Sequence, residues 1–133
     1  RATCLTLPKQ AYEGSDSLVL NGGVRISDLN FKHYQFSSID VVTHLLGHQN
    51  TNIENLYVIG GASIYKQMID YCDEAVITWV DKFIPEGDKR FPIMQLLTEF
   101  ECTNTADWKM SKTGDQYKIR YYKRKNVYPK KEI

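Results

Sequence analysis

Two adjacent glycines, Gly60 and Gly61, separate a short apolar run from an amphipathic segment. The run, residues 56–59, combines β-branched and aromatic side chains and predicts a short buried strand. After the glycines, apolar side chains recur at helical spacing from Ile64 to Tyr71, which predicts a helix with one buried face. Glycines at such a junction either form a tight turn or let the backbone approach an anionic ligand at the helix start. From these residues alone, both explanations stay open.

Strand-like and helix-like patterns alternate along the rest of the chain. An opening helix over residues 1–8 is followed by predicted strands within 17–23 and 33–38, and Ser38 is expected to cap the next helix. After the helix that follows the glycines, residues 73–83 form another β-rich run. This alternation predicts an α/β fold with a mainly parallel, twisted sheet and flanking helices on both faces.

The C-terminal part of the chain predicts a different kind of strand pairing. Two β-rich segments, 100–110 and 117–125, are joined around Gly114, which suits a hairpin turn. Because no helix separates these segments, they predict an antiparallel hairpin at the edge of the sheet. In the second segment Ile119 and Tyr121 alternate with Lys118, Arg120 and Tyr122, as in a strand with one buried face.

Length, charge and cysteine content limit the possible partners. A chain of 133 residues is the size of one domain, so we expect a single domain over 1–133. It has no apolar run long enough to span a bilayer, and its three widely spaced cysteines are typical of the reducing cytoplasm. Seven of the 17 basic residues follow residue 116, but their alternation with tyrosines fits a half-buried strand better than a nucleic-acid surface. We expect neither a nucleic acid nor a membrane as partner.

The residues that could carry chemistry favour a phosphate-bearing ligand. His44 and His48 are four residues apart on a predicted helix, but no carboxylate stands at a useful spacing, so no metal site is expected. The sequence also contains no G-x-S-x-G, P-loop or G-x-G-x-x-G motif. Instead, residues 21–23, 37–38 and 60–61 each follow a predicted strand. Open α/β sheets bind ligands beyond the carboxyl ends of their strands, so these segments are expected to converge.

Two segments, "VIGGASIYKQMI" and "ITWVDKFIPEGDKRFP", resemble the dihydrofolate reductase family. The shared pattern is a strand ending in Ile-Gly-Gly, a helix with Tyr in its first turn, a Thr in the next strand, and Glu-Gly-Asp-x-x-Phe-Pro. "RATCLTLP" resembles the family's Gly-Arg-x-Thr segment, and "SLVLNGG" resembles its Asn-x-Val-Leu-Ser strand. The resemblance implies an oxidoreductase that transfers a hydride from NADPH to dihydrofolate, giving tetrahydrofolate for one-carbon metabolism.

The resemblance also implies where the cofactor binds. The NADPH-binding residues that it implies are Arg1, Thr3, Leu20, Asn21, Gly22, Ser37, Ser38, Ile59, Gly60, Gly61, Ala62, Ser63, Ile64 and Tyr65. Residues 20–22 would run beside the adenosine ribose and its phosphate, and residues 37–38 would flank the adenine end. Gly60 and Gly61, joined in the family by a cis peptide bond, would let the pyrophosphate lie against the backbone.

The substrate and the catalytic residues follow from the same resemblance. The Ile59 carbonyl and the Tyr65 ring would lie near the nicotinamide and the pterin, and Thr78 would form a hydrogen bond toward the catalytic acid. Tyr65 and Thr78 are therefore the expected catalytic residues, with Ile59 and Thr78 binding substrate. The family's catalytic carboxylate, its first strand and its closing loop are expected upstream of Arg1.

One departure from the family pattern keeps two alternatives open. Ser15 stands where the family has an arginine that grips the substrate's carboxylate, and serine cannot form that bidentate ion pair. The chain could therefore reduce a non-folate substrate on the same fold, such as an intermediate of the riboflavin pathway. It could also be a non-catalytic nucleotide-binding fragment, which would pair or swap through unpaired strand edges, whereas the complete protein would be a monomer.

Overall fold

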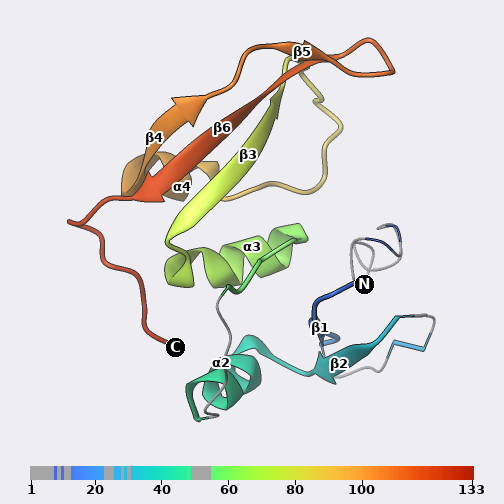
Figure 1. Ribbon diagram of the computed structural model, residues 1–133, viewed down its shortest axis with the longest axis vertical. Coiled ribbons are helices and arrows are strands. Elements are labelled where there is room, and N and C mark those ends of the chain that lie inside the picture. The colour runs from blue at the N-terminus through green and yellow to red at the C-terminus, as the bar shows by residue number, and fades with distance from the viewer. Residues whose placement is uncertain are drawn as a thin grey trace. The chain divides into compact units, whose positions relative to one another are not determined.

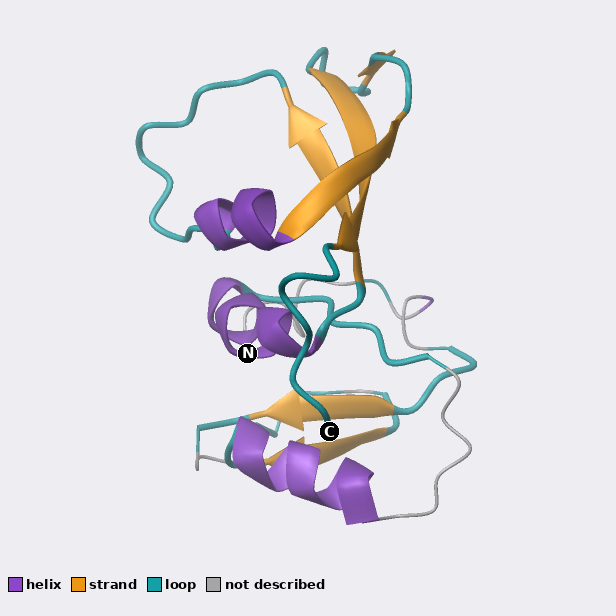
Figure 2. Cartoon of the chain, turned by 90° about the vertical axis from the view of Figure 1, so that its left-hand side faces the viewer, coloured by secondary structure: helices purple, strands orange, loops and turns teal. Residues whose placement is uncertain are grey.

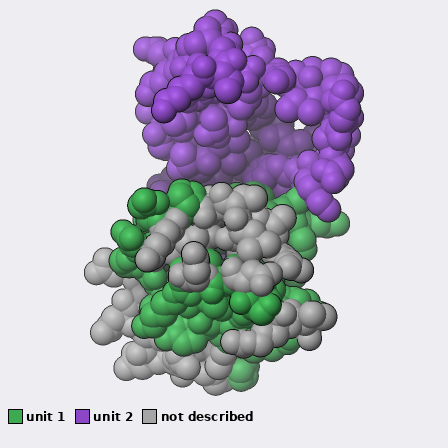
Figure 3. Space-filling model, turned by 90° about the vertical axis from the view of Figure 1, so that its right-hand side faces the viewer, with its two compact units in different colours: residues 1–67, 133 green, residues 68–132 purple. Residues whose placement is uncertain are grey.

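The computed structural model describes residues 8, 10, 13–22, 26, 27, 29, 31–48 and 55–133, without the side chains of Leu45 and His48. The chain divides into two compact units. Unit 1 comprises residues 1–67 and 133, and unit 2 comprises residues 68–132 (Figure 3). The predicted opening helix falls almost entirely on residues 1–7, which lie outside the described residues.

Unit 1 contains a two-stranded parallel sheet followed by a helix (Figures 1 and 2). The strands β1 (Ser17–Leu20) and β2 (His33–Phe36) pair in register, and α2 (Ile39–His48) contacts β2. Ser38 Oγ accepts a hydrogen bond from Val41 N (3.5 Å), which is the predicted helix cap. The sequence prediction of these two strands and this helix is confirmed.

The predicted strand over residues 56–59 is not formed. Residues 55–61 belong to no helix or strand, and the Tyr57 side chain is 78% exposed. A β-prone run becomes a strand only where a neighbouring strand completes its hydrogen bonds. Among the described residues, β1 and β2 pair only with each other, so this run has no such neighbour. The helix expected after the glycines is present as α3 (Ala62–Met68) and the 3₁₀ turn η2 (Ile69–Tyr71).

Unit 2 is built on a four-stranded antiparallel sheet (Figure 1). Its strands are β3 (Glu74–Val80), β4 (Phe100–Thr105), β5 (Lys109–Met110) and β6 (Gln116–Arg124). The predicted hairpin is present, and Gly114 in its turn has φ +88°. It lies at an edge of the described sheet, as predicted, because β4 is a terminal strand in the order β3–β6–β4. Residues 81–99 connect β3 to β4, and these two strands pair with opposite sides of β6. The strand pattern alone did not reveal this order.

The overall class is mixed α/β, as predicted, but the described sheets are not mainly parallel. Parallel pairing is confined to β1 and β2, whereas every described pairing of β6 is antiparallel. Parallel strands need a crossover of a dozen or more residues, and the short β4–β5–β6 connections allow only antiparallel neighbours. The described residues thus show the mixed α/β class, and the mainly parallel sheet stays a prediction.

A helix that the sequence pattern missed covers the core of unit 2. This helix, α4 (Ile93–Glu99), buries Leu96 completely, and the core cluster consists of Ile69, Leu96, Phe100 and Tyr122. With seven residues, α4 is too short for a helical period to stand out. The signal that could have located it is Pro92 directly before Ile93, with Leu96 three residues further on.

The buried face of β6 is opposite to the predicted one. Tyr122 is 4% exposed, whereas Tyr121 is 40% exposed. Basic side chains share the side of Tyr122 and lie over aromatic rings: Lys118 over Trp108 (4.5 Å), Arg120 over Trp79 (5.0 Å) and Arg124 over Phe100 (4.4 Å). Long basic side chains can bury their stems and place their charge on a ring, so a charged residue does not mark the solvent face here.

Replacing Tyr122 by phenylalanine is expected to lower the free energy of unfolding by about 1 kcal/mol. The Tyr122 hydroxyl accepts a hydrogen bond from Trp79 Nε1 (3.1 Å), and this donor would lose its partner in the core. Urea denaturation followed by circular dichroism measures the change. The control is Tyr121→Phe on the exposed face, with an expected change within about 0.5 kcal/mol. Equal midpoints for the two variants would contradict the role of this hydrogen bond.

Candidate functional site

The carboxyl ends of β1 and β2 bring one group of predicted site residues together. Leu20 pairs with Phe36, and Asn21 N donates a hydrogen bond to Phe36 O (2.9 Å), which extends the pairing by one residue. Residues 20–22 therefore lie beside Ser37 and Ser38 at one edge of the sheet, as predicted. Gly22 has φ +63°, a backbone conformation that favours glycine.

The glycine turn forms the second group. The Gly60–Gly61 peptide bond is cis, as the resemblance implied, and Gly60 has φ +107°. A Cβ atom at Gly60 would lie 3.1 Å from Tyr65 Oη and 3.2 Å from two carbons of the same ring. The Tyr65 ring thus covers the Gly60 Cα, and no larger residue fits there unless the ring moves. Glycine is required at this position for both its backbone conformation and its size.

The start of α3 directly follows this turn. Tyr65 N donates to Gly61 O (2.9 Å), which is the first hydrogen bond of the helix. Three N–H groups precede the donor of that hydrogen bond and take no part in the helix's own series of i to i−4 hydrogen bonds: those of Ala62, Ser63 and Ile64. The glycine turn and the first turn of the helix together contain the predicted site residues Ile59, Gly60, Gly61, Ala62, Ser63, Ile64 and Tyr65.

Burial raises the pKa of the Tyr65 phenol above its ordinary value of 10.0, because desolvation disfavours the phenolate. At neutral pH Tyr65 therefore presents an uncharged hydroxyl group. In the folded chain it is a hydrogen-bonding group and not an anion.

This shift predicts a loss of stability at high pH. Because the pKa of Tyr65 is higher in the folded chain than in the unfolded chain, the neutral phenol favours folding. This contribution to the free energy of unfolding is fully present below pH 10.0 and is lost as the pH rises through the pKa of the folded chain. Tyr65→Phe should remove this part of the pH dependence. Thermal melting of both proteins at increasing pH, with a difference ultraviolet titration, measures it. Parallel pH profiles for the two proteins would contradict the shift.

The remaining predicted site residues are Thr78, Arg1 and Thr3. Thr78 is an exposed residue of β3 in unit 2, opposite Ile119 on β6. Arg1 and Thr3 lie outside the described residues. The predicted convergence of all these positions on one site stays a prediction.

One residue near the first group was missed by the sequence analysis. Gln35 on β2 accepts a hydrogen bond from the Asn21 side chain (3.1 Å) and contacts the backbone of Ile26. The signal that could have found it is a glutamine inside a short strand of otherwise aromatic character.

Two features are absent from the part of the chain that the structure describes. They contain no group of three or more His, Cys, Asp or Glu residues that could hold a metal ion. None of the helices formed by these residues has the length and apolar character needed to cross a membrane.

Comparison with known proteins adds a family to this geometry. No significant match is found among curated proteins. The sequence model of the family described as dihydrofolate reductase, in contrast, matches residues 9–124. This match spans most of the chain, including both strand ends, the glycine turn and the whole of β3. The chain therefore belongs to the dihydrofolate reductase family.

Proposed function

We propose that this chain is an NADPH-dependent reductase that transfers a hydride to dihydrofolate. The observation that carries the proposal is the glycine turn, in which Gly60 and Gly61 directly precede α3 and the Tyr65 ring lies against Gly60. Family membership supports the reaction type and the substrate class. We also propose the fold that the family implies, a mainly parallel sheet with flanking helices and a C-terminal antiparallel hairpin.

The residues present fit a dinucleotide phosphate. Gly61 carries no side chain that would keep a ligand from the backbone, and the N–H groups that precede the first hydrogen bond of α3 are donors suited to a pyrophosphate. At the carboxyl ends of β1 and β2, a Cβ atom on Gly22 would meet no atom of the described residues within 4 Å, so among these residues there is open space beside Gly22. The exposed Ser37 supplies a hydroxyl group beside it. We assign the adenosine end of NADPH to these strand ends.

The chain's own residues would bind and orient the reactants, while NADPH, when bound, supplies the hydride. We assign the Ile59 carbonyl the role of a hydrogen-bond acceptor near the nicotinamide and the pterin, and the uncharged Tyr65 ring the role of a packing surface. The Thr78 hydroxyl would orient the acid that protonates the substrate. Arg1 and Thr3 would contact the cofactor phosphates.

A second candidate function rests on Ser15. Residues 13–16 form an exposed turn in which Ser15 offers no cation for a carboxylate. Without a guanidinium at this position, the glutamate portion of a folate loses its bidentate ion pair. This observation favours a reductase of the same fold that acts on a substrate without that carboxylate.

The test is the loss of NADPH absorbance on addition of dihydrofolate, compared with dihydropteroate, which lacks the glutamate. We expect NADPH absorbance to fall when dihydrofolate is added. Equal kcat/KM values for both substrates would mean that nothing replaces the missing arginine, whereas a preference for dihydrofolate would locate a carboxylate-binding group elsewhere. NADPH binding without turnover of either substrate would favour the second candidate, and absence of NADPH binding would contradict both.

A further inference from the structure

The Gln35 side chain holds the chain segment that follows β1. Gln35 Oε1 accepts hydrogen bonds from Asn21 Nδ2 (3.1 Å) and Ile26 N (2.9 Å). Gln35 Nε2 donates to Ile26 O (2.7 Å) and lies 3.0 Å from His33 Nε2. A primary amide can accept two hydrogen bonds and donate two, so these contacts use its full capacity.

The contacts with Ile26 resemble pairing between two strands. The Gln35 amide bonds both the N–H and the C=O of Ile26, as a residue of a neighbouring strand would, and the Ile26 side chain is buried. His33 Nδ1 lies 2.7 Å from Phe31 O, which requires the proton on Nδ1. His33 Nε2 is then an acceptor for Gln35 Nε2. The amide orientation is thus fixed by its neighbours on both sides.

We infer that Gln35 is a positioning residue that holds Asn21 and Ile26 for cofactor binding. The inference rests on the proposed function, which assigns the phosphorylated adenosine end of NADPH to residues 20–22. Gly22 directly follows Asn21 and has φ +63°, and a Cβ atom there would meet no atom of the described residues within 4 Å. Residues that are held in their binding conformation before the ligand arrives lose less entropy on binding. The Gln35 amide provides that restraint at Asn21 and at Ile26.

The test compares the binding of three probes to the wild type, Gln35→Leu and Gln35→Glu. The probes are NADPH, the adenosine bisphosphate that forms its adenosine end, and reduced nicotinamide mononucleotide. Gln35→Leu removes all four hydrogen bonds, whereas Gln35→Glu keeps the two acceptor contacts and loses the two donors. The control is Tyr34→Phe, because Tyr34 is the exposed neighbour on the same strand.

For Gln35→Leu we expect affinity for NADPH and for the adenosine bisphosphate to fall about tenfold, and affinity for the mononucleotide to change less than about twofold. Gln35→Glu should lie between Gln35→Leu and the wild type, and Tyr34→Phe should equal the wild type. Amide hydrogen exchange should show faster exchange at Ile26 in both Gln35 variants. If Gln35→Leu does not fold, the same comparison on Gln35→Glu decides.

Two results would overturn the inference. If the Gln35 variants bind NADPH as the wild type does, or lose affinity for all three probes equally, Gln35 has only a structural role. If the wild type itself binds neither NADPH nor the adenosine bisphosphate, the proposed function fails, and the inference fails with it. The wild-type measurement therefore distinguishes the two failures.

Discussion

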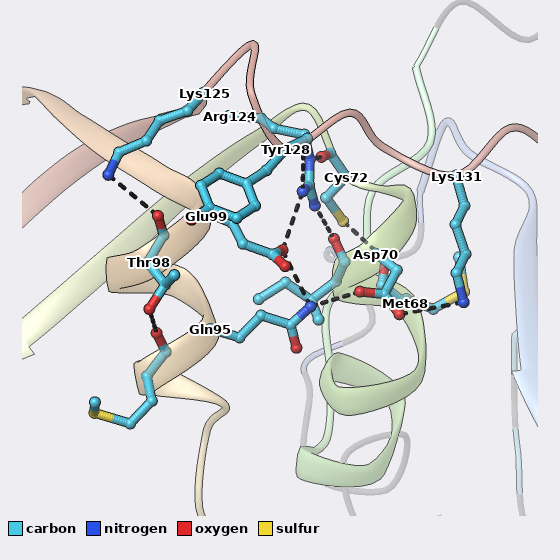
Figure 4. Close-up of polar contacts among 12 residues, drawn as sticks. Met68, Asp70, Cys72, Gln95, Thr98, Glu99, Arg124, Lys125, Tyr128 and Lys131 are labelled. Atoms are coloured by element: carbon cyan, nitrogen blue, oxygen red, sulfur yellow. Dashed lines mark hydrogen bonds and ion pairs between the residues drawn. The ribbon is translucent and has the colours of Figure 1, made fainter.

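Replacing Arg124 by methionine is expected to lower the free energy of unfolding by about 3–5 kcal/mol. Its side chain is 9% exposed and forms an ion pair with Glu99 (Arg124 Nη1 to Glu99 Oε2, 3.1 Å) (Figure 4). The guanidinium also donates to three backbone carbonyls: Nε to Cys72 O (2.8 Å), Nη2 to Ile69 O (2.6 Å) and Nη1 to Tyr128 O (3.1 Å). Methionine would leave these acceptors and the carboxylate without their common donor.

This effect is large because one side chain of β6 joins three other segments of unit 2. Arg124, at the end of β6, forms hydrogen bonds to η2 and the following Cys72, to the end of α4, and to the C-terminal segment. Its guanidinium group also lies over the Phe100 ring. Lysine could not replace it, since a single ammonium group cannot reach acceptors spread around a planar fork. Arg124→Lys is therefore expected to recover less than half of the loss.

Urea denaturation of Arg124→Met against Lys123→Met measures this contribution. Lys123 is the preceding residue of β6, exposed on the opposite face, and its replacement should change stability by no more than about 0.5 kcal/mol. If both variants unfold at the wild-type midpoint, Arg124 does not hold the segments of unit 2 together.

Replacing Gly60 by alanine is expected to lower the free energy of unfolding by about 2–3 kcal/mol and to weaken NADPH binding about 100-fold. A residue with a Cβ atom is strained at φ +107°, and this Cβ atom would lie 3.1–3.2 Å from the Tyr65 ring. Either the ring moves away or the turn changes its path. Both responses alter the surface that we assign to the pyrophosphate and the nicotinamide.

Gly114→Ala is the matched control for this variant. Gly114 also has a positive φ (+88°), but a Cβ atom there would meet nothing within 4 Å. Gly114→Ala should therefore lower the free energy of unfolding by about 1 kcal/mol, from backbone strain alone, and leave the affinity for NADPH unchanged. Isothermal titration calorimetry measures the affinities. Equal NADPH affinity in Gly60→Ala and the wild type would remove the main support for the proposed cofactor site.

The elements that could be predicted from the sequence are those whose signals are local. The short apolar runs of β1 and β3 and the cap at Ser38 depend on neighbours within a few positions. The paired glycines also pointed to the turn before α3, because a demand for positive φ is a property of single residues.

The features that could not be predicted depend on contacts between distant positions. The run 56–59 has strand-forming residues but lacks a partner among the described strands, and α4 is too short to show a period. The face of β6 was wrongly predicted because aromatic rings on other segments accommodate its basic side chains. Gln35 was missed for the same reason, since its bonding partners become visible only when β1 and β2 are paired.

Hydride transfer itself provides the most direct test of the proposed function. The experiment uses NADPH that carries deuterium at the transferred position, with dihydrofolate as acceptor and mass spectrometry of the folate product. We expect the product to be tetrahydrofolate that carries the deuterium, in an amount equal to the NADPH consumed. NADPH that binds without reducing dihydrofolate, or that is oxidised without passing its deuterium to the pterin ring, would contradict it.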